Sequence, residues 1–275
     1  MREKAASLKV AVKEMDYESE AEKKMIHNEI AVMKYIYQIV QKSARSSFIH
    51  IVQPLGFFLN EEGDKVYIVM EYCSQGDLRK YINVMKGKGV KISPAKAYDF
   101  LGQIAVSLNQ LHCNGIIHSD IKPENILLTE DFKVKLSDFG VARQQQKGNE
   151  YLTQNGGTFL YQAPEYLYSA LDNEISPQII KTIQTIASDI WAFGVTMFEL
   201  LAQNHPFFDN KEGEDLQMFE LIHRIVNSQP AALPDQYPLN LKNIIKRMQE
   251  KDPSRRITAE QILNIHEVAG SLNEK

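Results

Sequence analysis

The sequence predicts an α+β fold, with strands and one long helix in a small N-terminal part and mainly helices in the remainder. Three observations predict it. Apolar side chains recur every three or four residues over 18–40 and over 93–111, which is the period of an amphipathic helix. Short apolar runs at 51–59 and 66–71 have the length and composition of strands. Residues 189–202 are apolar on nearly all sides, which is typical of a buried helix.

The helix over 18–40 presents one apolar face. That face carries Ile26, Ile30, Met33, Tyr37 and Val40. Glu29 lies off-centre on the same face and can point toward Lys13. A glutamate in such a helix is more often solvated, so the sequence leaves both interpretations open.

Capping residues mark the helices of the second part. Ser93 is a predicted N-cap followed by Pro94 in the first turn, and Thr258 with Gln261 forms a capping box for the last helix. A further helical pattern begins at Ser176. An amphipathic connector packed on the large part explains that pattern better than a helix that docks a partner.

A cluster of polar residues carries the chemistry. Residues 118–125 read HSDIKPEN, and Asp138 comes thirteen positions after Asn125. Short β-type runs flank both segments, so Asn125 and Asp138 lie at opposite ends of a predicted hairpin. Phosphoryl transfer needs a carboxylate beside the attacking hydroxyl and oxygen ligands for Mg²⁺. Asp120 fits the first function, Asn125 and Asp138 fit the second, and Lys122 can neutralise charge on the moving phosphate.

In these segments the chain resembles a eukaryotic-type protein kinase of the serine/threonine branch, and this family is itself a standard example of phosphoryl transfer. The resemblance runs from about Leu8 to about Ile265. Its motifs are VAVK ending at Lys13, the helical Glu29, the loop 118–125, Asp138-Phe139-Gly140, Ala163-Pro164-Glu165, Asp189-Ile190-Trp191 and Arg256. The KPEN ending of the loop and Thr158 in GGTFLYQAPE resemble the serine/threonine branch.

The resemblance implies a two-lobed protein. Residues 1–72 would form a small lobe with one helix and about three strands, and residues 73–275 a mainly helical lobe with the catalytic loop and activation segment. Glu165 of the large lobe would pair with Arg256. The chain would transfer the γ-phosphoryl group of Mg²⁺-ATP to hydroxyl groups of a protein substrate.

The resemblance also implies roles for residues on both sides of the nucleotide. Lys13, paired with Glu29, would contact the α and β phosphates, and Asp120 would orient the hydroxyl and accept its proton. Met70 resembles the gatekeeper. Glu71 to Cys73 match the family's hinge, and Cys73 would lie beside the adenine site. Asp77 and Glu124 match positions that contact the ribose or the substrate.

Asp77 and Glu124 carry a hypothesis about the substrate. In the family these positions can form an acidic pocket, which leads us to expect Arg or Lys upstream of the acceptor. Either residue could instead cap a helix or contact ribose. His118 resembles a residue that packs beneath the loop, so we expect it to be structural rather than a general base.

One departure from the family concerns ATP binding. The family places a glycine-rich loop ahead of the motif lysine, but here twelve residues precede Lys13 and the first glycine is Gly56. A loop that approaches phosphates closely needs residues without a Cβ. We therefore expect weakened ATP binding. An incomplete chain explains this better than a kinase-like binding module without catalysis, because the catalytic positions downstream are intact.

Composition narrows the classes of protein to which the chain could belong. The net charge of −4 and 24% charged residues do not suggest a nucleic-acid partner, and no apolar run has the length of a membrane span. Cys73 and Cys113 form no disulfide framework. We expect a cytosolic or nuclear protein. A small-molecule phosphotransferase shares the Asp-Asn-Asp magnesium site, but the long activation segment and Lys122 favour a protein substrate.

A second departure generates a prediction about regulation. Ser119 stands where many kinases carry an arginine that binds a phosphate on the activation segment, and serine has no charge to pair with phosphate. We expect Thr153→Ala, or phosphorylation of Thr153, to change the rate of phosphoryl transfer by only a few-fold. Arg143 and Lys147 offer another site for a phosphate. A rate change of about a hundredfold in a peptide assay would contradict the prediction.

Overall fold

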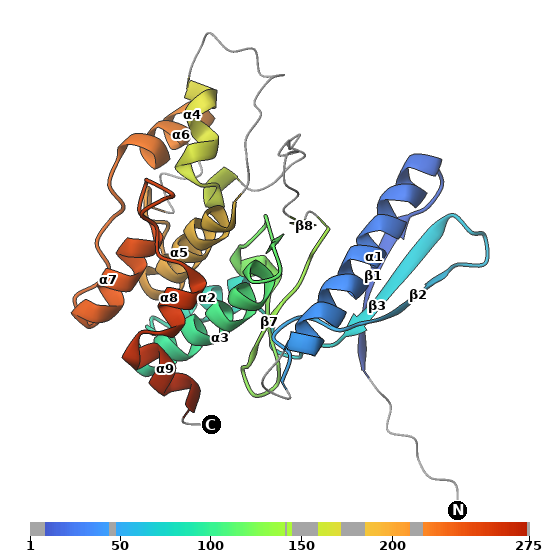
Figure 1. The fold of residues 1–275 in the computed structure, drawn as a ribbon, viewed down its shortest axis with the longest axis horizontal. Helices are drawn as coiled ribbons and strands as arrows, with labels where there is room; N and C mark the ends of the chain where they lie inside the picture. The colour runs from blue at the N-terminus through green and yellow to red at the C-terminus, as the bar shows by residue number, and fades with distance from the viewer. Residues whose placement is uncertain are drawn as a thin grey trace, which may run out of the picture.

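The computed structural model describes residues 9–43, 48–140, 142–144, 159–171, 185–209 and 217–273. They form two lobes (Figure 1). The N-terminal lobe holds one long helix beside a sheet, and the other lobe is mainly helical with short strands near the boundary. The two-lobed α+β prediction is therefore confirmed.

The sheet of the small lobe has three antiparallel strands in the order β1-β3-β2. Their bounds are β1 Val10–Asp16, β2 Pro54–Leu59 and β3 Lys65–Glu71. The register pairs Lys13 with Ile68. Within the part of the chain that the structure describes, β1 is an edge strand.

The expected strand over 51–59 is wrong at its beginning. β2 begins at Pro54, where the register with β3 shifts between Pro54 and Gly56. Ile51 instead forms an isolated bridge with Leu136 of the large lobe. The segment before β2 therefore joins the lobes instead of extending the sheet.

The predicted helix is present as α1, Glu20–Ser43, which lies along the sheet (Figure 1). Its buried positions are Ile26, Glu29, Ile30, Met33, Ile36 and Val40. Tyr37, predicted on this face, is half-buried and packs against the core, and Ile36, which was not predicted, is fully buried beside it. Glu29 is buried, so it does not have the solvated environment that a helical glutamate usually has.

Helices form most of the large lobe. They are α2 Leu78–Gly87, α3 Pro94–His112, α4 Pro164–Leu171, α5 Ile186–Ala202, α6 Met218–Asn227, α7 Leu239–Met248, α8 Ala259–Leu263 and α9 His266–Asn273. Ser93 caps α3 by accepting from the Lys96 N–H, as predicted. The capping box of Thr258 and Gln261 is also present, but it belongs to α8, and α9 follows it.

Short strands carry the catalytic segments. The sheet β4-β6-β7 comprises Gly76–Asp77, Ile126–Leu128 and Val134–Leu136, and β5 Ile116–Ile117 pairs with β8 Arg143–Gln144. Ile126 lies opposite Leu136 in the β6–β7 hairpin. The predicted hairpin therefore brings Asn125, just before β6, close to the segment that follows β7.

The buried centre of the large lobe is α5. Thirteen consecutive residues, from Asp189 to Leu201, are buried, as expected for a helix that is apolar on nearly all sides. Two of them, Asp189 and Glu199, are acidic. Among the described residues, no helix is long and apolar enough to cross a membrane.

Several predictions fall on residues outside the described part. These are the helical pattern after Ser176, together with Thr153, Thr158, Lys147 and the side chain of Arg143. They stay predictions.

His205 lies in the turn after α5 and gives the fold a pH dependence. Its Nε2 bonds the carbonyl of Leu160 at 3.0 Å, and its Nδ1 accepts from the Phe207 N–H at 3.3 Å. This pattern requires the neutral ring, with the proton on Nε2. Burial lowers the pKa of His205 to about 4.

We expect His205 to make the free energy of unfolding fall as the pH drops from 6.5 to 4. An unfolded histidine binds a proton near pH 6.5, whereas the folded one does so only near pH 4. The difference amounts to about 3 kcal/mol once the pH is below both values. His205→Gln should remove this part of the acid sensitivity in urea unfolding, and the exposed His223→Gln should leave it. Parallel pH profiles for wild type and His205→Gln would contradict the assignment.

Candidate active site

The catalytic loop brings three of the predicted residues together. The carboxylate Oδ2 of Asp120 accepts from Lys122 Nζ at 2.8 Å and from Asn125 Nδ2 at 2.7 Å. Asn125 Nδ2 also donates to the backbone carbonyl of Asp120 at 2.8 Å. Asn125 ends the 3₁₀ turn η1, Pro123–Asn125, so this short turn folds the amide back onto the carboxylate.

The beginning of the loop is held by α5. The carboxylate of Asp189 accepts from the backbone N–H of His118 at 2.8 Å and of Ser119 at 2.9 Å. His112, at the end of α3, contacts the same carboxylate at 3.0 Å. Ser119 has a φ of 71°, which is uncommon for a residue other than glycine and places Asp120 beyond the turn.

His118 packs beneath the loop and does not face the acceptor site. It is fully buried, its Nε2 contacts the Ser137 carbonyl at 3.1 Å, and its ring lies 4.9 Å from the ring of Phe139. Burial lowers the pKa of His118, which favours a neutral ring. These contacts place it as the sequence predicted and support a structural function.

A pocket of about 180 Å³ between the lobes collects the residues expected around the nucleotide. Its lining includes Lys13, Glu29, Met70, Glu71, Asn125 and Asp138. Lys13 Nζ lies 2.6 Å from Glu29 Oε1 and 4.0 Å from Asp138 Oδ1. The predicted Lys13–Glu29 pair is thus present. The ammonium of Lys13 lies between the Glu29 carboxylate and that of Asp138, which belongs to the other lobe.

Three of the residues expected around the nucleotide do not line this pocket. Cys73 is buried in the segment after β3, and burial raises the pKa of its thiol to about 11, which keeps it protonated near neutral pH. Asp77 caps α2 by accepting from the Lys80 N–H at 2.8 Å. Glu124 pairs with Arg79 Nε at 2.8 Å. A ribose contact by Asp77 or Glu124 stays a prediction.

Glu71 contributes differently from its neighbours in the pocket. Its carboxylate lies 2.6 Å from Nζ of Lys135, whose side chain is almost fully buried on β7. The side chain of Glu71 therefore ties the end of β3 to the large lobe. A contact with adenine would come from backbone groups, as the family resemblance implies.

The oxygen ligands that Asn125 and Asp138 bring to the pocket fit Mg²⁺ bound together with phosphate. Asn125 uses its Nδ2 for Asp120, which leaves its Oδ1 as an oxygen ligand, and the Asp138 carboxylate is half-exposed in the same pocket. Among the described residues, no group of three or more His, Cys, Asp or Glu could hold a metal ion. Mg²⁺ usually takes one or two protein ligands and completes its shell with phosphates and water.

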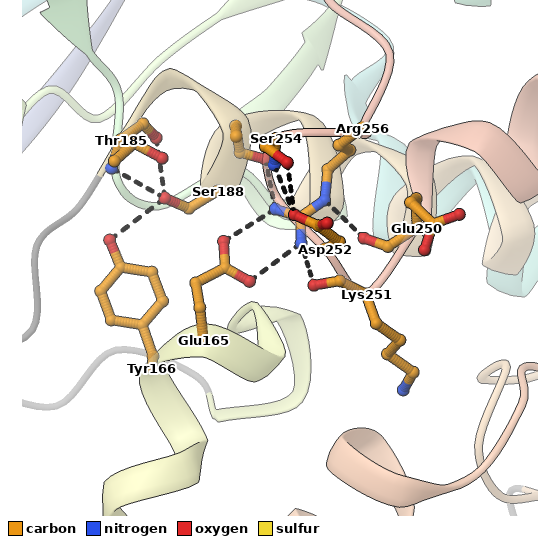
Figure 2. Close-up of polar contacts among 10 residues, drawn as sticks. Glu165, Tyr166, Thr185, Ser188, Glu250, Lys251, Asp252, Ser254 and Arg256 are labelled. Atoms are coloured by element: carbon orange, nitrogen blue, oxygen red, sulfur yellow. Dashed lines mark hydrogen bonds and ion pairs between the residues drawn. The ribbon is translucent and has the colours of Figure 1, made fainter.

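Behind the site, a buried ion pair fixes the segment that enters α4. The carboxylate of Glu165 faces the guanidinium of Arg256 (Figure 2), and the two N–O distances are 2.8 and 2.9 Å. Arg256 has no exposed side-chain surface and also donates to the carbonyls of Ala187 and Glu250. The pair implied by the family resemblance is thus present, and it joins α4, α5 and the segment before α8.

Four residues near the site were not predicted from the sequence to act there. The sequence identifies Asp189 only as the beginning of a motif, and it predicts no function for Arg79, Tyr161 or Glu199. A sequence signal existed for two of them, because acidic side chains in a helix that is apolar on all sides need buried partners.

Two lobes, a Lys–Glu pair in the pocket between them and an Asp-Asn-Asp set in and beside that pocket are the arrangement that the resemblance to protein kinases implies. A family model described as the protein kinase domain matches residues 1–267, and the chain belongs to that family.

Curated relatives of this chain belong to the serine/threonine branch of the family. The serine/threonine-protein kinase Nek6 of Oryza sativa subsp. japonica is 33% identical over 204 residues, covering 74% of this chain and 34% of that protein. Nek1 of Mus musculus is 32% identical over 203 residues, covering 74% of this chain and 15% of that protein. Stk11 of Xenopus laevis is 31% identical over 227 residues, covering 81% and 48%. The chain thus spans less than half the length of each of these serine/threonine kinases.

The buried Glu165–Arg256 pair generates a stability prediction. Arg256→Ala leaves the Glu165 carboxylate without its bidentate partner, so we expect the free energy of unfolding to fall by about 3 kcal/mol. Arg256→Lys should restore only part of it, because an ammonium cannot form the two parallel bonds. The exposed neighbour Arg255→Ala should change it by less than about 0.5 kcal/mol. Equal urea midpoints for the alanine variants would show that the pair does not stabilise the fold.

Proposed function

We propose that this chain is an ATP-dependent protein serine/threonine kinase, which transfers the γ-phosphoryl group of ATP to hydroxyl groups of a protein substrate. The observation that carries the proposal is the convergence of Asp120, Lys122 and Asn125 within hydrogen-bond distance, next to the pocket that Lys13 and Asp138 line. Membership of the kinase family and similarity to serine/threonine kinases support it.

Each residue has a separate function in the proposed reaction, which follows from its position. Asp120 orients the acceptor hydroxyl and takes its proton, since its carboxylate is fixed by two donors. Lys122, which already lies against Asp120, balances negative charge on the transferring group. Lys13, fixed by Glu29, holds the α and β phosphates.

Asn125 and Asp138 would hold Mg²⁺. When bound, the ion supplies charge neutralisation between the phosphates, and this chain supplies the oxygen ligands and their orientation. Asn125 is oriented by its own bonds to Asp120. Asp138 has a φ of 61°, which is strained for a residue other than glycine, and its Oδ1 accepts from the Gly140 N–H at 3.4 Å.

A non-catalytic kinase-like module is the second candidate. One observation favours it: residues 1–55 contain no glycine, so these residues cannot themselves form a glycine-rich loop for the phosphates. The two candidates differ in whether a phosphoryl group is transferred.

Two substitutions test the catalytic proposal. Asp120→Asn should lower phosphoryl transfer to a serine/threonine peptide by about a hundredfold or more, because the amide cannot accept the proton. It should leave thermal stabilisation by Mg²⁺-ATP intact. Asp138→Asn should lower both transfer and the stabilisation, since it removes a charged ligand for Mg²⁺. Radiolabel transfer from ATP and a thermal-shift assay provide the two measurements.

The matched control is Asp131→Asn, which removes an exposed carboxylate at the turn between β6 and β7. It should change neither quantity. Wild-type protein that transfers no label and is not stabilised by Mg²⁺-ATP would favour the non-catalytic module. Transfer that survives Asp120→Asn would contradict the assignment of the base.

A further inference from the structure

A single guanidinium beside the catalytic loop joins two carboxylates from separate elements. Arg79, in the first turn of α2, donates through Nε to Glu124 Oε1 at 2.8 Å. Its Nη2 donates to Glu199 Oε2 at 2.9 Å. Glu124 belongs to η1 and Glu199 to α5, so Arg79 connects three elements.

Tyr161, the last residue of the 3₁₀ turn η2 (Phe159–Tyr161), completes the cluster from a fourth element. Its hydroxyl donates to Glu199 Oε2 at 2.5 Å and accepts from Arg79 Nη2. Burial raises the pKa of Tyr161, which keeps the hydroxyl protonated as a donor. Glu199 is buried, whereas Glu124 is exposed over nearly half of its side chain. The cluster therefore has a buried end at Glu199 and an open end at Glu124.

The open end lies next to the acceptor site. Glu124 immediately precedes Asn125, whose amide bonds the Asp120 carboxylate. Tyr161 and Asp120 line the same cavity of about 40 Å³. A substrate chain that presents its hydroxyl to Asp120 would therefore pass the Arg79 cluster with a neighbouring side chain.

We propose that Arg79 is a specificity-determining residue, whose guanidinium occupies the acidic subsite that a basic substrate side chain would otherwise fill. The kinase would then accept proteins without Arg or Lys upstream of the acceptor. This inference rests on the proposed kinase function, and it replaces the expectation of basic selection by Asp77 and Glu124.

The electrostatics of the cluster support this assignment. Glu124 and Glu199 share one cation, and Asp77 is engaged as the cap of α2. A substrate arginine could bind these carboxylates only by displacing Arg79, and it would be repelled by the positive charge of Arg79 as it approached. Displacement would leave Glu199 buried without a cation, which is strongly unfavourable. A neutral or acidic substrate side chain does not meet this obstacle.

The test compares peptides that differ only in having Arg or Gln at one of the positions upstream of the acceptor. For wild type we expect kcat/KM ratios of Arg to Gln within about threefold at every such position. Arg79→Met keeps an apolar stem but frees the carboxylates. The ratio at one position should then rise between about tenfold and a hundredfold, as for one charge-assisted hydrogen bond.

Two further variants protect this test against loss of folding or a general charge effect. Lys80→Met removes an exposed cation from the same turn of α2 and should leave the ratios unchanged. Arg79→Met/Glu199→Gln removes the Arg79 cation together with the buried Glu199 carboxylate, so it should fold even where Arg79→Met does not. It leaves the Glu124 carboxylate free and should still select arginine.

Peptide affinity, measured by fluorescence polarisation, separates this inference from the kinase proposal. If no variant transfers phosphate but Arg79→Met gains affinity for the arginine peptide, only the kinase proposal fails. A wild-type preference for Arg or Lys of tenfold or more would overturn the role of Arg79. Unchanged peptide affinities and ratios in both folded Arg79 variants would overturn it as well.

Discussion

The rest of the site depends on the hydrogen bonds that the carboxylate of Asp189 accepts. It accepts from two consecutive backbone N–H groups at the beginning of the catalytic loop and from His112. Ser119 reaches its left-handed conformation, with a φ of 71°, at this point. A strained backbone persists only where its surroundings determine it, and the two donors aimed at one carboxylate do so. The loop in turn satisfies a charge that an apolar helix could not bury alone.

The site lies where the two lobes meet, so its geometry depends on the few contacts between them. The Ile51–Leu136 bridge, the Lys135–Glu71 pair and the Lys13–Asp138 approach cross this boundary. The pocket is lined by one ammonium, that of Lys13, and by the carboxylates of Glu29, Glu71 and Asp138, of which Glu71 pairs with Lys135. This local excess of negative charge favours a divalent cation, and the cation in turn favours phosphate.

The parts of this structure that could be predicted from the residue pattern alone, without the family resemblance, are local. Asn125 and Asp138 are joined by a hairpin of short strands, so the spacing in the chain already implied their proximity. The sequence does not determine which residues of α1 are most buried. A step of three residues from Met33 reaches Ile36, and a step of four reaches Tyr37. Both steps fit a period of 3.6, and only packing against the lobe selects between them. Pro54 interrupts the register that the apolar run at 51–59 suggested.

The Arg79 cluster could not be predicted in this way, because its members come from α2, η1, η2 and α5. What the sequence does contain is the anomaly behind it, namely two acids in the apolar helix α5. Asp189 and Glu199 are ten residues apart, or about 15 Å along a helix. Asp189 holds the catalytic loop, and Glu199 holds the side chains that flank the acceptor site.

Buried ion pairs contribute little net stability compared with well-packed apolar side chains. Retention of both acids is therefore better explained by position than by stability. A rigid, buried helix fixes the distance between these two anchors. Asp120, the proposed base, and the Arg79 cluster, the proposed specificity surface, are thereby held at a fixed distance from each other.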